Sequence, residues 1–343
     1  MGAMKIVSIK DIAGQCGVSI ATVSKALNNH TDISEATRKR VCSTAKKMGY
    51  LPNSQARALK TNKTFNIGVL FVDKAGKGFT HSYFAPVLNG FKVEAEKMGY
   101  DVTFISRHIG KNAMSYYEHC KYRRVDGIMV ACMDFYDSEV IELLNGDIPL
   151  VAVDFESERH YSVTSDNSIG MQTLVKYVSS KGHRKIACIY GDSSQITSIR
   201  LNAFLDTMKE EGLPVIPDYI RQGKYHDAES SRSLVREMLS FSEPPTCILM
   251  PDDFSAMVAK GTIEEMDLKV PNDVSITGYD GIYISEVMQP PLTTIRQNTV
   301  GIGRKAAEIL VKLMKKQEIF TESKKIIIEG KFIEGGTVKD LNI

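Results

Sequence analysis

Carboxylates close many of the apolar runs of this 343-residue chain, and they are its best candidates for ligand binding. An aspartate ends each of the runs "NIGVLFVD", "IPLVAVD" and "DVSITGYD". The full set is Asp73, Asp134, Asp154, Asp192, Asp252 with Asp253, and Asp280. Open α/β sheets bind ligands at the carboxyl ends of their strands, and a carboxylate accepts hydrogen bonds from hydroxyl groups. The pattern indicates a polyol ligand, with capping of the following helices as the alternative.

Motifs typical of enzymes are missing from the sequence. There is no GxSxG elbow, no P-loop and no HExxH pair, and no GxGxxG follows the first apolar run. Asp252 and Asp253 are paired carboxylates, but adjacent residues point in different directions. The six cysteines stand singly, without metal-site or disulfide spacing. We therefore expect no enzyme activity, no cofactor and no metal.

Charge is divided unequally along the chain. Residues 1–63 hold 11 Lys and Arg against 3 Asp and Glu, a net charge of +8, whereas the remaining 280 residues carry −6. A basic segment attached to an acidic body indicates a polyanionic partner. Because no apolar run reaches 18 residues and the N-terminus lacks an apolar signal segment, we expect a cytoplasmic protein that does not contact membrane.

The first fifty residues have the pattern of three helices, over 9–16, 20–28 and 34–50, with the turn "GVS" at 17–19. A helix, a short turn that begins with Gly and a second helix form a helix-turn-helix, with a plain helical hairpin as the alternative. The second helix of this motif enters the major groove of double-stranded DNA. Ile20, Ala21 and Lys25 are then expected to face base edges. Phosphates or flanking bases are expected to be reached by Thr22, Ser24 and Asn28.

From residue 64 onward, short apolar runs alternate with helical stretches, one of them expected over 111–123. This alternation is typical of a parallel α/β sheet. Some ten strands are too many for one small sheet, so we predict two doubly wound lobes. The expected boundaries are a headpiece at 1–50, a linker at 51–63 and a ligand-binding and dimerisation core at 64–343. Within the core, we assign the N-lobe to about 64–165 and 297–323, and the C-lobe to about 166–296 and 324–340.

Specific motifs occur in both the headpiece and the core. The headpiece contains "SIKDIAGQCGVSIATVSKALNN" and "ISEATRKRVCSTAKKMGYLPN", and the core contains "KGHRKIACIYG", "RLNAF", "VPNDVSITGYDG" and "PPLTTIRQN". These motifs resemble those of the LacI/GalR family of bacterial transcriptional regulators. The resemblance implies an all-α helix-turn-helix headpiece and a periplasmic-binding-protein-like core. It also implies a homodimeric repressor, less often an activator, that binds a pseudo-palindromic operator and responds to a small molecule.

The resemblance extends to the short segment after the headpiece. Asn53, Ala56 and Leu59 match the family's hinge helix, in which the Leu enters a minor-groove base step and kinks the DNA. Arg57 suits a flanking phosphate. Sealing of the core is the alternative role for Leu59. The complete expected DNA-contacting set is Ser8, Lys10, Ser19, Ile20, Ala21, Thr22, Ser24, Lys25, Asn28, Thr37, Asn53, Ala56, Arg57 and Leu59.

The family's effector site lies between the two lobes. The expected effector-binding positions are His81, Tyr83, Phe84, Asp154, Arg200, Tyr225, Asp252 and Asp280. Aromatic faces stack on a pyranose ring and Arg makes paired hydrogen bonds, so a sugar or sugar derivative is the expected effector. Core packing remains an alternative role for the three aromatic residues, and plain solvent contact for His81.

Several alternatives stay open. A nucleobase effector would also suit aromatic, Asp and Arg side chains, and the family's catabolite-control branch uses a phosphoprotein co-repressor. A sugar-transport protein and an enzyme are more distant alternatives, because neither explains the basic headpiece. No Leu heptads follow Gly336, so we expect a dimer without a tetramerisation tail.

Overall fold

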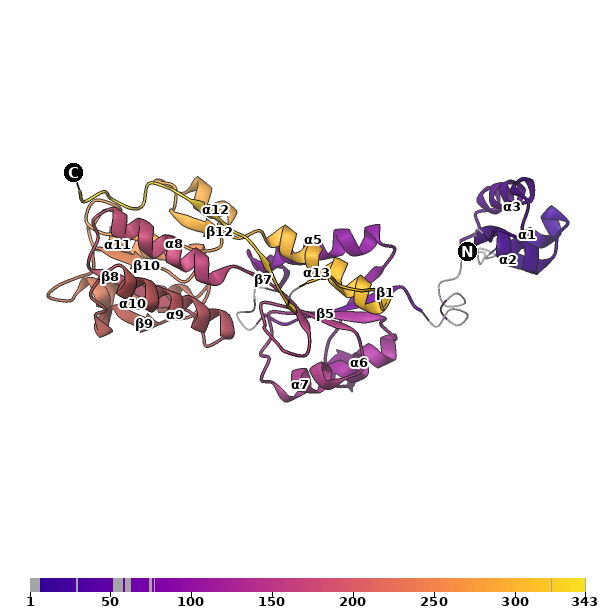
Figure 1. Ribbon diagram of the computed structural model, residues 1–343, viewed down its shortest axis with the longest axis horizontal. Coiled ribbons are helices and arrows are strands. Elements are labelled where there is room, and N and C mark those ends of the chain that lie inside the picture. The colour runs from indigo at the N-terminus through magenta and orange to yellow at the C-terminus, as the bar shows by residue number, and fades with distance from the viewer. Residues whose placement is uncertain are drawn as a thin grey trace. The chain divides into compact units, whose positions relative to one another are not determined.

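The fold was analysed in a computed structural model, which describes residues 7–28, 30–51, 58, 63–73, 76, 78–321 and 323–342. The chain divides into two compact units, residues 1–64 and 65–343, and each is described by itself (Figure 1). Within the described residues, no helix is both long and apolar enough to cross a membrane.

Residues 7–51 of the first unit form, where the structure describes them, three short helices: α1 (Ile9–Cys16), α2 (Ile20–Leu27) and α3 (Glu35–Lys47). Each helix begins after a serine whose side chain accepts a backbone N–H of the first turn, which satisfies one otherwise unpaired donor. Gly17 ends α1 with a φ of 62°, a backbone conformation that favours glycine. The helices enclose a small apolar core made of Ile12, Ala13, Cys16, Val23, Ala26, Val41 and Ala45.

The N-lobe of the second unit is built on a six-stranded parallel sheet of order β13-β7-β6-β5-β1-β2. Its strands are β1 (Asn66–Phe71), β2 (Asp101–Phe104), β5 (Gly127–Ala131), β6 (Leu150–Val153), β7 (Tyr161–Ser165) and β13 (Lys325–Ile328). Figure 1 shows α5 (Phe84–Lys97) and α13 (Thr299–Met314) on one face, and α6 (Tyr116–Arg123) and α7 (Ser138–Asn145) on the other. Because both faces are covered, β5 and β6 are apolar and buried throughout.

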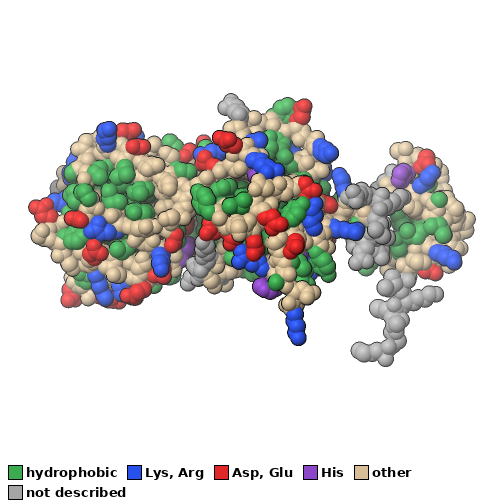
Figure 2. Space-filling view, turned by 90° about the horizontal axis from the view of Figure 1, so that it is seen from below, with side chains coloured by type: hydrophobic (Ala, Val, Ile, Leu, Met, Phe, Trp, Pro, Cys, Tyr) green, Lys and Arg blue, Asp and Glu red, His purple; other side chains and the backbone are tan. Residues whose placement is uncertain are grey.

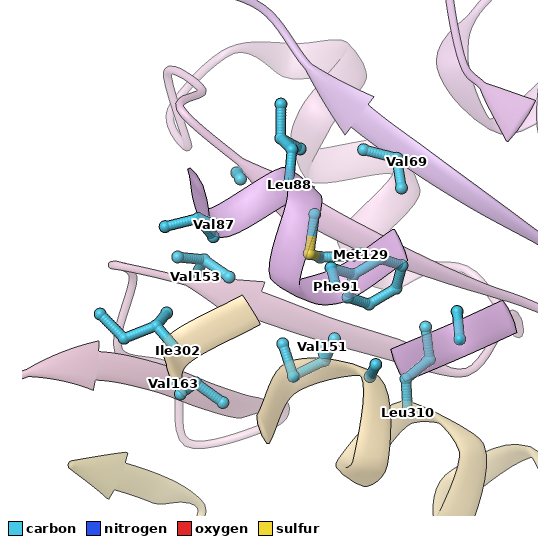
Figure 3. Close-up of a cluster of buried hydrophobic side chains, with 14 of the residues drawn as sticks. Val69, Val87, Leu88, Phe91, Met129, Val151, Val153, Val163, Ile302 and Leu310 are labelled. Carbon is cyan, nitrogen blue, oxygen red and sulfur yellow. The ribbon is translucent and has the colours of Figure 1, made fainter. Parts of the chain in front are cut away.

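Close packing of α5 against α13 fixes the start of α5, where several predicted site residues lie. Figure 3 shows Val87, Leu88 and Phe91 of α5 packed with side chains from the strands and from α13. A Cβ on Gly303 of α13 would lie 1.9 Å from the carbonyl oxygen of Val87, so only glycine permits this approach.

The C-lobe is built on a four-stranded parallel sheet of order β11-β10-β8-β9. Its strands are β8 (Ile186–Tyr190), β9 (Ile220–Gln222), β10 (Cys247–Leu249) and β11 (Ser275–Thr277). One apolar cluster joins the sheet to α8 (Asn167–Ser180) and α9 (Gln195–Glu210), and another joins it to α10 (Ala228–Leu239) and α11 (Asp253–Glu265). Helix α12 (Tyr283–Val287) and the antiparallel pair β12 (Thr294–Arg296) and β14 (Lys331–Ile333) complete the lobe. The predicted fold class, a helical headpiece and two parallel α/β lobes, is therefore confirmed.

The structure corrects the predicted lobe boundary at the C-terminal end. Strand β13 pairs in parallel with β7, so residues 325–328 belong to the N-lobe sheet and not to the C-lobe segment predicted from 324. The apolar run "KKIIIEGKFIEGG" looks continuous in sequence, but it is interrupted at Glu329 and Gly330. The chain there passes from the edge of one sheet to β14, and only strand pairing reveals the change of partner.

Three local elements also differ from the predictions. A short hairpin of β3 (His108–Ile109) and β4 (Asn112–Ala113) occupies the beginning of the helix predicted over 111–123, which starts only at Tyr116. Ser115 sets that start, because its hydroxyl accepts the Glu118 N–H while the Glu118 carboxylate accepts the Ser115 N–H. Helices α7 and α12 were not anticipated, and both have eight or fewer residues.

Candidate functional sites

The outer surface of α2 carries the residues predicted to read DNA. Val23 and Ala26 face the headpiece core, whereas Ile20, Ala21 and Lys25 are exposed. Ile20 at the start of α2 is 53% exposed and is not among the residues of the headpiece core. An apolar side chain, Ile20, and a cation, Lys25, thus lie on the exposed surface of α2.

Other predicted DNA-contacting residues already have partners within the headpiece. The Ser19 and Thr22 hydroxyls are 2.9 Å apart, and the Asn28 side-chain amide donates to the Ser24 carbonyl over 2.7 Å. Ser8 caps α1, and the Thr37 hydroxyl lies 2.9 Å from that of Ser34. Lys10 is exposed. Asn53, Ala56, Arg57 and Leu59 lie outside the described residues.

Lys25 makes a contact that the sequence analysis did not anticipate. Its ammonium group donates to the Asp32 carboxylate, which lies in the loop between α2 and α3. The hydrogen bond from Lys25 lowers the pKa of Asp32. Asp32 therefore pairs with the cation that was predicted to read guanine.

In the second unit, the eight predicted effector residues form one group at the junction of the lobes, here called the inter-lobe cluster: His81, Tyr83, Phe84, Asp154, Arg200, Tyr225, Asp252 and Asp280. Tyr83 and Phe84 stand at the start of α5, and Asp154 directly follows β6. The Tyr83 hydroxyl donates to the Asp154 carboxylate over 2.7 Å, and Thr164 donates to its other oxygen over 3.0 Å. Burial raises the pKa of Asp154, whereas these two hydrogen bonds partly offset the increase.

On the C-lobe side, Arg200 of α9 is held in a fixed orientation. Its Nε donates to the Asn167 side-chain oxygen over 2.7 Å, and its guanidinium carbon lies 3.6 Å from the centre of the Tyr279 ring. A terminal nitrogen lies 3.9 Å from Asp280. Burial raises the pKa of Asp280 to about 6, despite the opposing effect of Arg200. The cluster thus combines an oriented guanidinium with a carboxylate that titrates near neutral pH.

His81 is a neutral hydrogen-bond donor in this arrangement. Its Nδ1 accepts the backbone N–H groups of Tyr83 and Phe84, at 3.3 and 3.4 Å, which places the ring proton on Nε2. Burial and the nearby His226 lower the pKa of His81 to about 4. Asp73, His81 and Cys132 bring metal-ligand atoms within 4.8 Å of one another. A protonated Nε2 has no lone pair for a metal, so this group does not have the form of a metal site.

Asp252 behaves as a helix cap. It is the N-cap of α11, and its two oxygens accept the N–H and hydroxyl of Ser255 at 2.7 and 3.0 Å. It also accepts the backbone N–H of His226 over 3.1 Å, and it is 1% exposed. The capping alternative therefore describes Asp252 better than direct ligand contact. Tyr225 has internal partners too, since its hydroxyl lies 3.0 Å from that of Thr197.

The sequence analysis missed residues that complete the cluster. Gln297 donates to Asp280 over 2.6 Å, and its side-chain oxygen is buried without a hydrogen-bond partner among the described residues. Asn167 and Tyr279 hold Arg200, as described above. Gln297 lies in the "TTIRQN" motif and Tyr279 directly precedes Asp280. These positions, inside a family motif and beside a predicted site residue, could have identified both residues from the sequence. Their polar character alone could not, because many other residues share it.

Comparisons with known proteins agree with this architecture. Residues 8–53 match the family "Bacterial regulatory proteins, lacI family", and residues 175–338 match the "Periplasmic binding protein-like domain". Proteins named HTH-type transcriptional repressor PurR are 31% identical in Vibrio parahaemolyticus and 32% identical in Photobacterium profundum. Each alignment covers 98% of this chain and 99% of the relative.

Solved structures show the same fold. The lac repressor dimer bound to operator and the anti-inducer ONPF superimposes with a TM-score of 0.81 at 24% identity, over 98% of this chain and all of the other. The complex of the transcriptional regulator CelR with cellobiose gives a TM-score of 0.71 at 22% identity, over 96% of this chain and 99% of the other.

The chain therefore belongs to the lacI family of bacterial regulatory proteins. It is a DNA-binding transcriptional repressor and not an enzyme, as the sequence analysis predicted.

Proposed function

We propose that this repressor binds a pseudo-palindromic operator as a homodimer and is controlled by an uncharged sugar or sugar derivative held by the inter-lobe cluster. The proposal rests on one observation. Asp154 from one lobe lies close to Arg200 and Asp280 from the other. Burial of these groups strengthens their hydrogen bonds to ligand hydroxyls. In this proposal, the headpiece at 1–50 binds the operator and the core from 64 onward binds the effector. A linker at 51–63 connects them.

The charges of the cluster support an uncharged effector. Asp154, Asp252 and Asp280 provide three carboxylates, Arg200 provides one fixed cation, and burial keeps His81 neutral at pH 7 because its pKa falls to about 4. A phosphorylated or carboxylated ligand would add negative charge to a group that is already acidic. Neutral hydroxyl groups can both donate to the carboxylates and accept from Arg200.

The comparisons with known proteins favour two different classes of effector. The similarity to proteins named PurR supports a nucleobase, for which Tyr83, Phe84 and Tyr225 offer ring faces. The similarity in fold to a regulator in complex with cellobiose supports a sugar. A phosphoprotein co-repressor is a third alternative and would not need the cluster at all.

Exposed apolar side chains support the dimer. Val93 on α5, Phe104 at the end of β2 and Val300 on α13 are 40%, 43% and 42% exposed. Hydrophobic side chains also lie among acidic and basic ones on the lower face of the α/β unit, which Figure 2 shows and which is not the face of α5. We propose that the surface of α5, α13 and β2 meets a second copy of the chain.

A thermal-shift screen tests the effector, because a ligand that binds the folded state stabilises it by RT ln(1 + [L]/Kd). D-glucose, cellobiose, glucose 6-phosphate and adenine distinguish neutral sugar, phosphorylated sugar and nucleobase. A compound that binds must also change operator affinity, since the two ligands alter each other's affinity by the same factor. A shift with glucose 6-phosphate, and none with neutral sugars, would overturn the charge argument.

A further inference from the structure

The side-chain amide of Gln195 joins the two lobes through a pair of hydrogen bonds. Gln195 is the first residue of α9 in the C-lobe, and Glu156 lies in the loop that follows β6 in the N-lobe. The Glu156 backbone N–H donates to the Gln195 oxygen over 2.7 Å, and the Gln195 nitrogen donates to the Glu156 carbonyl over 3.1 Å. The amide thus satisfies both backbone groups of one residue in the opposite lobe.

Both partners are fixed to the lobe that carries them. The Glu156 carboxylate forms an ion pair with Lys325 of β13, which ties the loop to the N-lobe sheet. On the other side, Ser194 caps α9 by accepting the Thr197 N–H over 3.1 Å. Because each end is supported, separation of the lobes must break the Gln195–Glu156 pair.

The pair lies next to the carriers of two proposed effector ligands. Asp154 precedes Glu156 by two residues in the same loop, and Arg200 follows Gln195 by five residues on the same helix. We propose that Gln195 is a positioning residue, which sets the separation of Asp154 and Arg200 when the lobes are closed and so favours the closed form. This role rests on the proposed effector site, although the hydrogen-bond pair itself does not.

Hydrogen exchange of the full-length chain tests the pair without any effector. In Gln195→Ala, the Glu156 amide should exchange at least about tenfold faster than in the unmodified chain, because its acceptor is lost. Amides of β6 should not change. Gln222→Ala is the matched control, since Gln222 donates to Ser193 within the C-lobe over 3.2 Å. Equal protection of Glu156 in Gln195→Ala and the unmodified chain would overturn the proposal.

Gln195→Glu separates hydrogen bonding from packing. The carboxylate has nearly the same size and keeps the acceptor for the Glu156 N–H, but its second oxygen opposes the Glu156 carbonyl. Glu156 exchange should therefore accelerate in this variant at pH 7. Retained protection would show that the bond from the Gln195 nitrogen to the Glu156 carbonyl is not needed to join the lobes, and the paired arrangement would be refuted.

An effector measurement tests the positioning role. For whichever of D-glucose, cellobiose or adenine binds the unmodified chain, Gln195→Ala should raise the half-saturating concentration about tenfold, while Gln222→Ala leaves it unchanged. An unchanged value in Gln195→Ala would refute the role. If none of the three compounds binds, the effector proposal fails, and the exchange experiment still decides whether the pair closes the lobes.

Discussion

Replacing Arg200 should both destabilise the α/β unit and remove the effector response. The side chain is 8% exposed and is held by Asn167, by the Tyr279 ring and by Asp280. Removing one member of a buried, charge-assisted group leaves its partners unsatisfied, at a cost of roughly 3–5 kcal/mol.

This loss of unfolding free energy can be converted into a change in melting temperature, Tm. A loss of 1 kcal/mol lowers Tm by about 2–4 °C for a domain of about 150–250 residues. Arg200→Ala should therefore lower the Tm of the α/β unit by about 6–20 °C. Differential scanning calorimetry of the full-length chain measures this change. The headpiece transition should not move, because its core shares no residues with this cluster.

A second variant shows whether the cost is electrostatic. In Arg200→Ala with Asp280→Asn, the carboxylate that Arg200 leaves unpaired is also removed, so part of the Tm should return. Tyr177→Phe is a control, since Tyr177 bonds to Glu334 at an exposed position. A fall of less than about 1 °C in Arg200→Ala would refute the reasoning that this buried group is mutually supporting.

Four other predictions concern single groups. Binding of a neutral sugar should weaken as pH falls from 7 to 5, because burial raises the pKa of Asp280 to about 6 and its protonation removes an acceptor; titration calorimetry at several pH values would show it, and a flat profile would exclude Asp280 from binding. The same raised pKa means that the unmodified chain loses folding stability as pH rises from about 4 through 6, because burial disfavours the ionised Asp280. In urea titrations, the free energy of unfolding of Asp280→Asn minus that of the unmodified chain should therefore be larger at pH 7 than at pH 4. Asp32→Asn should free Lys25 and strengthen binding to nonspecific DNA, with a salt dependence steeper by about one unit in anisotropy titrations, whereas an unchanged slope would show that Lys25 does not reach phosphate. Leu59→Ala should weaken operator binding far more than nonspecific binding if the side chain is a minor-groove wedge, and equal losses would make its segment a plain linker.

Periodicity and capping residues in the sequence predicted most of the fold. Helix α9 illustrates why: Ser194 supplies the cap, and Ala203, Phe204 and Met208 lie at helical spacing facing the core. The predicted helix 111–123 failed at its beginning because a two-residue strand pair has too few residues for a recognisable alternation. Strand β13 was assigned to the wrong lobe because an edge strand carries no mark of the sheet that it joins.

The candidate site was predictable in its members but not in their roles. The strand-end aspartates are chemically identical in sequence, yet Asp154 accepts from Tyr83 whereas Asp252 caps α11. Lys25 looked available to DNA until the loop after α2 placed Asp32 beside it. Each role depends on which partner lies within hydrogen-bond reach. The donor to Asp154 is distant in sequence, the donors to Asp252 include nearby Ser255, and the acceptor for Lys25 lies in a loop without periodicity.

The sequence by itself determined the headpiece, the alternating α/β core and the residue types available for recognition, because caps, turns and apolar spacing act over a few neighbouring residues. Only the tertiary structure decided how those residues are used. Arg200 stacks on Tyr279, His81 is held as a neutral donor, and Gln195 reaches the backbone of Glu156 in the other lobe. The contacts of Arg200 and Gln195 join segments far apart in the chain, and the local contact of His81 depends on the backbone at the start of α5. In each case burial and geometry select one partner from many chemically equivalent ones.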